Sequence, residues 1–121
     1  MVDEVLLLTA RVLLRACSPQ TAHRIMRSLG RSLPPLTSRA EVQRAVRGLR
    51  GPGSCLSRAL AIAARSEASE VVIGVEWIDE KFLAHAWLEI DGAPLDPTDP
   101  RGGEIARLAH PAAGGACRQT G

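Results

Sequence analysis

The stretch GPGSCLSRALAIA, residues 51–63, decides the fold because it joins a sharp break in the chain to an apolar helix. Its opening Gly-Pro-Gly interrupts whatever structure precedes it. Ser54 is of a residue type that caps helices. The residues behind it are apolar at helical spacing, which predicts a helix from Cys55 to about Arg65.

Cys55 is the candidate nucleophile of this stretch. A thiol at the start of a helix meets unpaired backbone N–H groups and the positive end of the helix dipole, and both lower its pKa. The position therefore suits a nucleophile. A free cysteine can equally be a small buried apolar residue. Cys55 alone does not decide between the two interpretations.

A candidate base lies in FLAHAWLEIDG, residues 82–92, which is typical of a strand that ends in a hairpin turn. Alternation along a strand places His85 and Trp87 on one face and Ala86 and Leu88 on the other. A histidine there can take a proton from a thiol and return it to a leaving amine. The alternative is a histidine that only serves the core or the sheet edge.

A candidate acid follows the hairpin. The turn at Asp91-Gly92 predicts that residues 93–95 pair back as a strand, so Asp96 should lie near His85 and accept from its ring. Asp99 competes for this role, and Asp96 is preferred because it lies closer to the strand that carries His85. The alternative role for Asp96 is that of a turn residue.

Outward from this stretch, the pattern predicts a helical first half and a β-rich second half. We expect helices over residues 3–16, 19–30 and 39–49, and a strand over 71–78. Helices followed by a small antiparallel sheet form an α+β fold. We expect one domain over residues 1–110, with a helical part at 1–50, a catalytic core at 51–110 and a flexible tail at 111–121.

Composition narrows the class of protein. The chain has 121 residues and only 2% aromatic residues, so aliphatic side chains must fill a core around Trp77, Phe82 and Trp87. Residues 1–50 carry nine arginines and three acids (+6), and residues 51–121 carry six basic and ten acidic residues (−4), which together give +2. The basic half can meet an acidic partner.

The remaining cysteines and histidines suggest no further site. Three cysteines close no disulfide framework, and no signal peptide or spanning segment is recognisable, so we expect a cytoplasmic protein. Cys17 and Cys117 are expected to be incidental thiols, and His23 and His110 surface residues.

Two other functions are disfavoured. A zinc site would need Cys55, His85, His110 and Cys117, whose spacing fits no familiar site, and we expect neither metal nor organic cofactor. Nucleic-acid binding would need stacking aromatics among the arginines, and the first half has none.

Several motifs together resemble a known family. They are Cys55-Leu56, Arg58-Ala59-Leu60, VVIGV and HAWLEIDG, with AEVQRAVRGLR upstream and EIARL downstream, and they cover residues 38–108. This set resembles the transglutaminase-like cysteine peptidases of lasso-peptide biosynthesis, the B2 leader peptidases, in their stand-alone split form. The chain departs from the family in lacking a glycine between residues 64 and 70, and in having Leu95-Asp96 where members often have an Asn-Asp or similar pair.

The resemblance implies a papain-like core in which Cys55 is the nucleophile, His85 the base and an aspartate, Asp96, the residue that orients it. The implied activity is removal of the leader from a ribosomally made lasso precursor. The implied partners are the precursor's leader region, a leader-recognition B1 protein and a lasso cyclase. The alternative function is a non-catalytic interaction module of the same maturation machinery.

Overall fold

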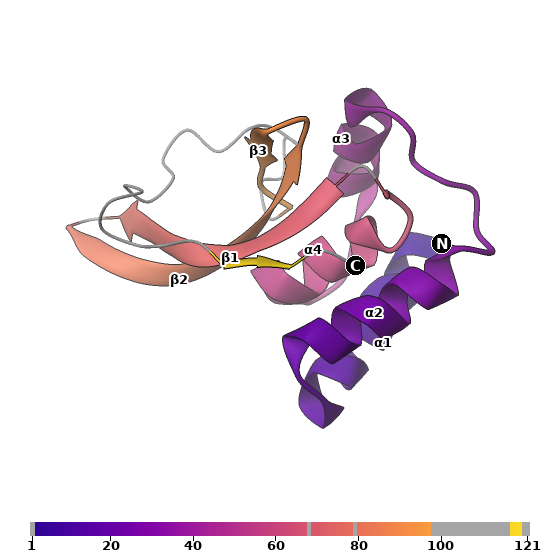
Figure 1. Ribbon diagram of the computed structural model, residues 1–121, viewed down its shortest axis with the longest axis horizontal. Coiled ribbons are helices and arrows are strands. Elements are labelled where there is room, and N and C mark those ends of the chain that lie inside the picture. Colours follow the sequence, from indigo (N-terminus) through magenta and orange to yellow (C-terminus); the bar gives the residue numbers. More distant parts are fainter. Residues whose placement is uncertain (1, 68, 79, 98–116, 120–121) are drawn as a thin grey trace.

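The computed structural model describes residues 2–67, 69–78, 80–97 and 117–119, which form an α+β fold (Figure 1). The helices are α1 (Val2–Ala16), α2 (Pro19–Gly30), α3 (Arg39–Gly48) and α4 (Cys55–Ala63). The strands are β1 (Ser69–Ile78), β2 (Lys81–Ile90), β3 (Ala93–Leu95) and β4 (Cys117–Gln119). Helices precede a small antiparallel sheet, so the expected fold class is confirmed.

Serine residues begin three of the helices. Ser18, Ser38 and Ser54 each have an extended backbone, and each side chain accepts a hydrogen bond from the backbone N–H three residues further on. Such caps satisfy donors that a helix leaves unpaired in its first turn. The helices therefore begin where the local sequence predicts.

The sheet has the strand order β3-β2-β1-β4, and each pair of neighbours is antiparallel. β1 and β2 pair along their whole length, from Ser69 opposite Ile90 to Ile78 opposite Lys81. The β2–β3 turn has a positive φ at both central residues, 54° at Asp91 and 76° at Gly92. This is the two-residue hairpin turn that the Asp-Gly pair predicts.

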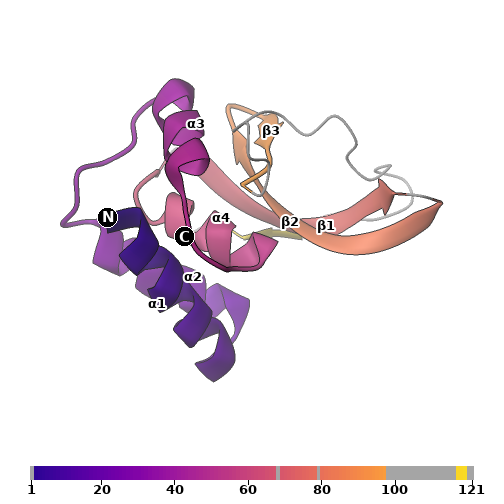
Figure 2. The same ribbon diagram turned by 180° about the vertical axis from the view of Figure 1, so that it is seen from behind.

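Helix α4 lies at the centre of the molecule, between the α1–α2 pair and the sheet (Figure 2). All five residues from Ala59 to Ala63 are fully buried. The sheet faces this helix with a set of buried apolar side chains that belong to the same core, namely Val71, Leu88, Ile90 and Leu95. The alanines of α4 let the neighbouring elements approach closely, so its position is firmly set by packing.

Helix α1 buries one face and exposes another. Leu6, Leu7 and Ala10 are buried against the core, whereas Leu8 and Val12 are more than half exposed. No helix within the described ranges is both long and apolar enough to cross a membrane.

One expectation about the C-terminal end of the chain requires correction. Residues 111–121 were expected to form a flexible tail, but Cys117–Gln119 form β4 and pair with Val71–Ile73 of β1. An uncovered strand edge offers unpaired backbone groups, and this segment pairs with them. The rest of the expected tail lies outside the described residues, as does His110, which precedes it.

His23 was expected on the surface, but only 1% of it is exposed. It shares the buried stripe of α2 with Met26 and Gly30, which follow it at helical spacing. Its ring accepts a hydrogen bond from Nε of Arg27 (3.3 Å). Burial, and then the charge of Arg27, lower the pKa of His23 to about 4, so the ring is neutral.

Of the three aromatic residues expected in the core, Trp87 is buried. The side chains of Trp77 and Phe82 lie outside the described part of the structure.

Candidate active site

Cys55 is the first residue of α4 and is half-buried. Ser54 caps the helix, with its Oγ accepting from the N–H of Ser57 at 3.1 Å. The thiol of Cys55 accepts a hydrogen bond from the backbone N–H of Ala86 on β2, with N and Sγ 3.3 Å apart. The nucleophile candidate is therefore tied to the sheet as well as to its own helix.

The short length of β3 accounts for this contact. β3 pairs with β2 only from Ile90 opposite Ala93 to Leu88 opposite Leu95. Ala86 lies two residues before Leu88 on β2, beyond the end of that ladder, and its N–H donates to the thiol of Cys55. An early end to β3 thus opens a place on the sheet for the start of α4.

His85 lies beside Ala86 on β2 and reaches Asp96. Its Nε2 and the Oδ2 of Asp96 are 3.1 Å apart, and the two side chains are only 12% and 14% exposed. Asp96 directly follows β3, and since Leu95 faces the core opposite Leu88, the next residue falls on the same face of the sheet as His85.

Trp87 supports the histidine ring. The two rings stack with their centroids 5.8 Å apart and their planes 28° from parallel. Trp87 is itself 4% exposed, and its indole Nε1 donates to Oε2 of Glu89 at 3.3 Å. A buried and hydrogen-bonded indole limits the rotation of the ring that stacks on it, so His85 has a defined orientation.

The electrostatics favour a charged histidine. The hydrogen bond with Asp96 and then the one with Cys55 raise the pKa of His85 to about 10, against burial, which lowers it. The negative charges of both partners act in the same direction as the hydrogen bonds. Because Nε2 of His85 binds Asp96, the ring nitrogen that remains for the hydrogen bond with the thiol is Nδ1.

The same contacts act on the cysteine. Burial raises the pKa of the Cys55 thiol, but the hydrogen bonds from His85 and from the N–H groups of Ala86 and Leu56, with the charge of His85, outweigh it and lower the pKa. A lowered thiol pKa next to a raised histidine pKa favours a thiolate–imidazolium pair. Such a pair is the activated form of a nucleophilic cysteine.

The structure brings together the three residues that the sequence singled out, Cys55 from α4, His85 from β2 and Asp96 from the end of β3. Asp99, the competing acid, lies outside the described residues. The role of the Ala86 N–H was not foreseen, since every residue type except proline carries one. Trp87 was expected on the face of His85 through strand alternation, but not in a stack with it.

Across residues 2–67, 69–78, 80–97 and 117–119, no three or more His, Cys, Asp or Glu side chains are arranged to hold a metal ion. A thiol, an imidazole and a carboxylate in contact are suited to proton transfer and nucleophilic attack.

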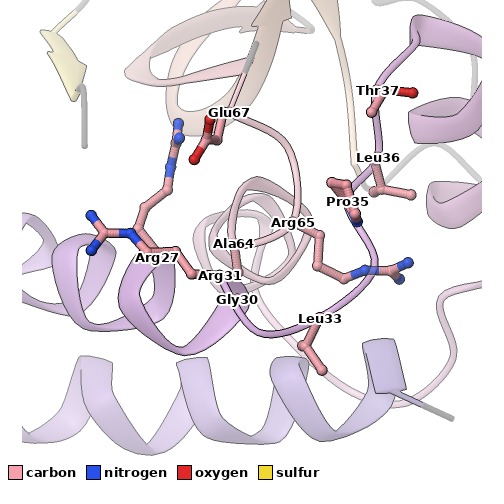
Figure 3. A pocket seen from close by; sticks show the side chains of 10 residues that line it. All are labelled: Arg27, Gly30, Arg31, Leu33, Pro35, Leu36, Thr37, Ala64, Arg65 and Glu67. Atoms are coloured by element: carbon pink, nitrogen blue, oxygen red, sulfur yellow. The ribbon is translucent and has the colours of Figure 1, made fainter.

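A separate pocket of about 740 Å³ lies at the opposite end of α4, beside Ala64 (Figure 3). Its lining includes three arginines, Arg27, Arg31 and Arg65. Arg65 is held by Asp3 (2.8 Å) and by the carbonyl of Pro34. Because α4 separates this pocket from Cys55, it is not the place where the thiol would react.

The chain was compared with family models, with curated proteins and with solved structures, and only the family models gave a match. Residues 5–108 match the family described as the transglutaminase-like superfamily, a span that contains Cys55, His85 and Asp96. That superfamily includes cysteine peptidases. The match covers most of the 121 residues, and the chain therefore belongs to the transglutaminase-like superfamily.

Proposed function

We propose that this chain is a cysteine peptidase that removes the leader peptide from a ribosomally made lasso-peptide precursor. The observation that carries the catalytic part is one histidine ring, His85, bonded to Asp96 on one side and to the thiol of Cys55 on the other. The lasso part rests on the resemblance of residues 38–108 to the B2 leader peptidases. We further propose that residues 1–110 act as a single domain in the cytoplasm.

In the first half of the proposed reaction, the thiolate of Cys55 attacks the carbonyl carbon of the scissile peptide bond. The oxygen gains the negative charge and is stabilised by backbone donors, of which the N–H of Cys55 is the first. Collapse of this intermediate breaks the C–N bond. His85 gives its Nδ1 proton to the leaving amine, which is the new N-terminus of the core peptide, and the leader stays on sulfur as a thioester.

In the second half, water replaces the amine. Neutral His85 takes a proton from the water while the water oxygen attacks the thioester carbonyl carbon. The C–S bond then breaks and releases the leader as a carboxylic acid. The sulfur leaves as a thiolate beside a histidine that is again protonated. Asp96 holds the ring through Nε2 in both halves and stabilises its positive charge.

The proposed partners follow from this role. A leader-recognition B1 protein would present the precursor's leader region, and a lasso cyclase would join the freed amine to a side-chain carboxylate. The exposed arginines of residues 1–50 suit an acidic surface on the B1 protein or on the precursor, and they are Arg15, Arg24, Arg31, Arg44, Arg47 and Arg50.

The test is mass spectrometry of a candidate lasso precursor incubated with this protein and its B1 partner. We expect a single cut between leader and core, and Cys55→Ala should reduce its rate by more than about 10⁴-fold. Cys17→Ala is the matched control, because Cys17 lies just after α1, where its thiol donates to the carbonyl of Leu13 and packs partly buried against the core.

The other outcomes are informative as well. Equal cutting by the wild type and the folded Cys55→Ala variant would exclude the cysteine mechanism. A precursor that stays intact with the folded wild-type protein and B1 would favour the non-catalytic interaction module.

A further inference from the structure

Arg39, the first residue of α3, contacts the β2–β3 hairpin although it is more than 50 residues away in the sequence. Its Nη2 donates to the carbonyl of Pro94 at 2.8 Å, and its Nη1 lies 3.3 Å from the carbonyl of Ala93 and 3.5 Å from that of Ile90. These carbonyls belong to both strands, on either side of the turn. One guanidinium therefore bridges the two strands of the hairpin next to its turn.

The hairpin needs such support because β3 is held weakly by the sheet. β3 has three residues and lies at the edge of the sheet, so within the described residues it pairs with β2 alone. Its middle residue is Pro94, a residue type that sheets confine largely to edge strands because it has no N–H to donate. The planar fork of an arginine can donate to several carbonyls at once, and it binds the carbonyl of Pro94, which points away from β2 in this register.

The placement of β3 decides the placement of the candidate acid. Asp96 directly follows Leu95, the last residue of β3, and it reaches Nε2 of His85 at 3.1 Å. Arg39 is a cation in the first turn of a helix, where the helix dipole disfavours positive charge. Its hydrogen bonds to the hairpin carbonyls offset this electrostatic cost.

We propose that Arg39 is a positioning residue, whose guanidinium fixes strand β3 and thereby holds the carboxylate of Asp96 against His85. This inference rests on the proposed function, since it concerns the same three residues. The contacts that carry this role are those of Arg39 with the backbone carbonyls of Ile90, Ala93 and Pro94.

The test measures the thiolate of Cys55 without any substrate. The full-length protein is alkylated with iodoacetamide at pH values from 4 to 10, and mass spectrometry of the peptides gives the rate at Cys55 alone. Arg39→Met keeps much of the length of the side chain but removes every donor. We expect its profile to shift to higher pH by about one unit, so the rate on the acidic limb falls about tenfold.

Three further variants give the comparison its meaning. Asp96→Asn should shift the profile in the same direction and at least as far, because His85 then holds its proton less firmly. Arg39→Lys, which keeps the charge but not the fork, should fall between Arg39→Met and the wild type. Arg44→Met is the matched control, since Arg44 is exposed on the same helix, and it should leave the profile unchanged.

Thermal unfolding of each variant separates positioning from folding. If Arg39→Met unfolds at a lower temperature but keeps the wild-type profile while Asp96→Asn shifts it, the proposal is overturned and Arg39 is only structural. If Arg39→Met does not fold, Arg39→Lys decides, and a wild-type profile for Arg39→Lys overturns the proposal. If Asp96→Asn also leaves the profile unchanged, the proposed roles of Asp96 and His85 fail first.

Discussion

At its C-terminal end, α4 meets α2 so closely that a Cβ added to Gly30 would lie 1.8 Å from the carbonyl oxygen of Ala64. At its N-terminal end the same helix carries Cys55, which is half-buried and is reached by hydrogen bonds from the sheet. One end is closed by small residues in direct contact, and the other is held by polar contacts that cross between elements.

The two ends of α4 therefore differ in role: the packed C-terminal end stabilises the fold, and the polar N-terminal end carries the candidate reactive residue. Close packing resists any change of volume, so the C-terminal end of α4 anchors the helix against α2. The polar contacts around Cys55 involve few atoms, but each sets a direction or a charge at the thiol or the ring. Substitutions at the two ends should therefore affect different measurements.

The largest expected effect is at the polar end. Asp96→Asn keeps the size of the side chain but removes the charge that holds the His85 proton, so leader cleavage should slow by on the order of 10²–10⁴-fold. The proton donor of the first half-reaction is present below the pKa of His85, about 10, and is lost as the pH rises through it. The alkaline limit of activity should thus move to lower pH in the variant.

Asp91→Asn is the control for this prediction. Asp91 is exposed in the hairpin turn with a φ of 54°, a conformation that asparagine also adopts, so rate and pH limit should stay close to wild type. If Asp96→Asn lowers the free energy of unfolding but leaves the cleavage rate close to wild type, the contacts around Cys55 stabilise the fold and do not set the reactivity.

The next effect tests the packed end. Gly30→Ala places a methyl group against the backbone of Ala64, and we expect the free energy of unfolding to fall by about 3 kcal/mol. Gly48→Ala, at the end of α3, meets nothing within 4 Å and should leave stability unchanged or raise it by about 0.5 kcal/mol. Urea denaturation measures both, and equal stabilities for the two variants would contradict the tight contact.

The smallest effect sharpens the comparison at the polar end. Ser54→Ala removes the cap of α4, and we expect a loss of about 1 kcal/mol in the free energy of unfolding. Ser28→Ala, an exposed position on α2, should change it by less than about 0.5 kcal/mol. A loss for Ser54→Ala as large as that for Gly30→Ala would mean that the start of α4 also anchors the fold.

The local sequence predicted most elements because their signals act over a few residues. Ser38 and Ser54 cap the helices that they were expected to begin, and Asp91-Gly92 forms the expected turn. Residues 93–95 form the expected strand. The same local signals singled out the cysteine, the histidine and the aspartate, whose catalytic roles remain predictions.

Only the tertiary structure decided what surrounds those three residues. The pairing of β4 with β1, the burial of His23, the N–H of Ala86 at the thiol and the hold of Arg39 on the hairpin were not foreseen. The contact of Ala86 with Cys55 and that of Arg39 with Pro94 join positions 31 and 55 residues apart. Each uses a backbone N–H or carbonyl group, which nearly every residue type carries. No side-chain pattern encodes such contacts, because they exist only once packing has brought the elements together.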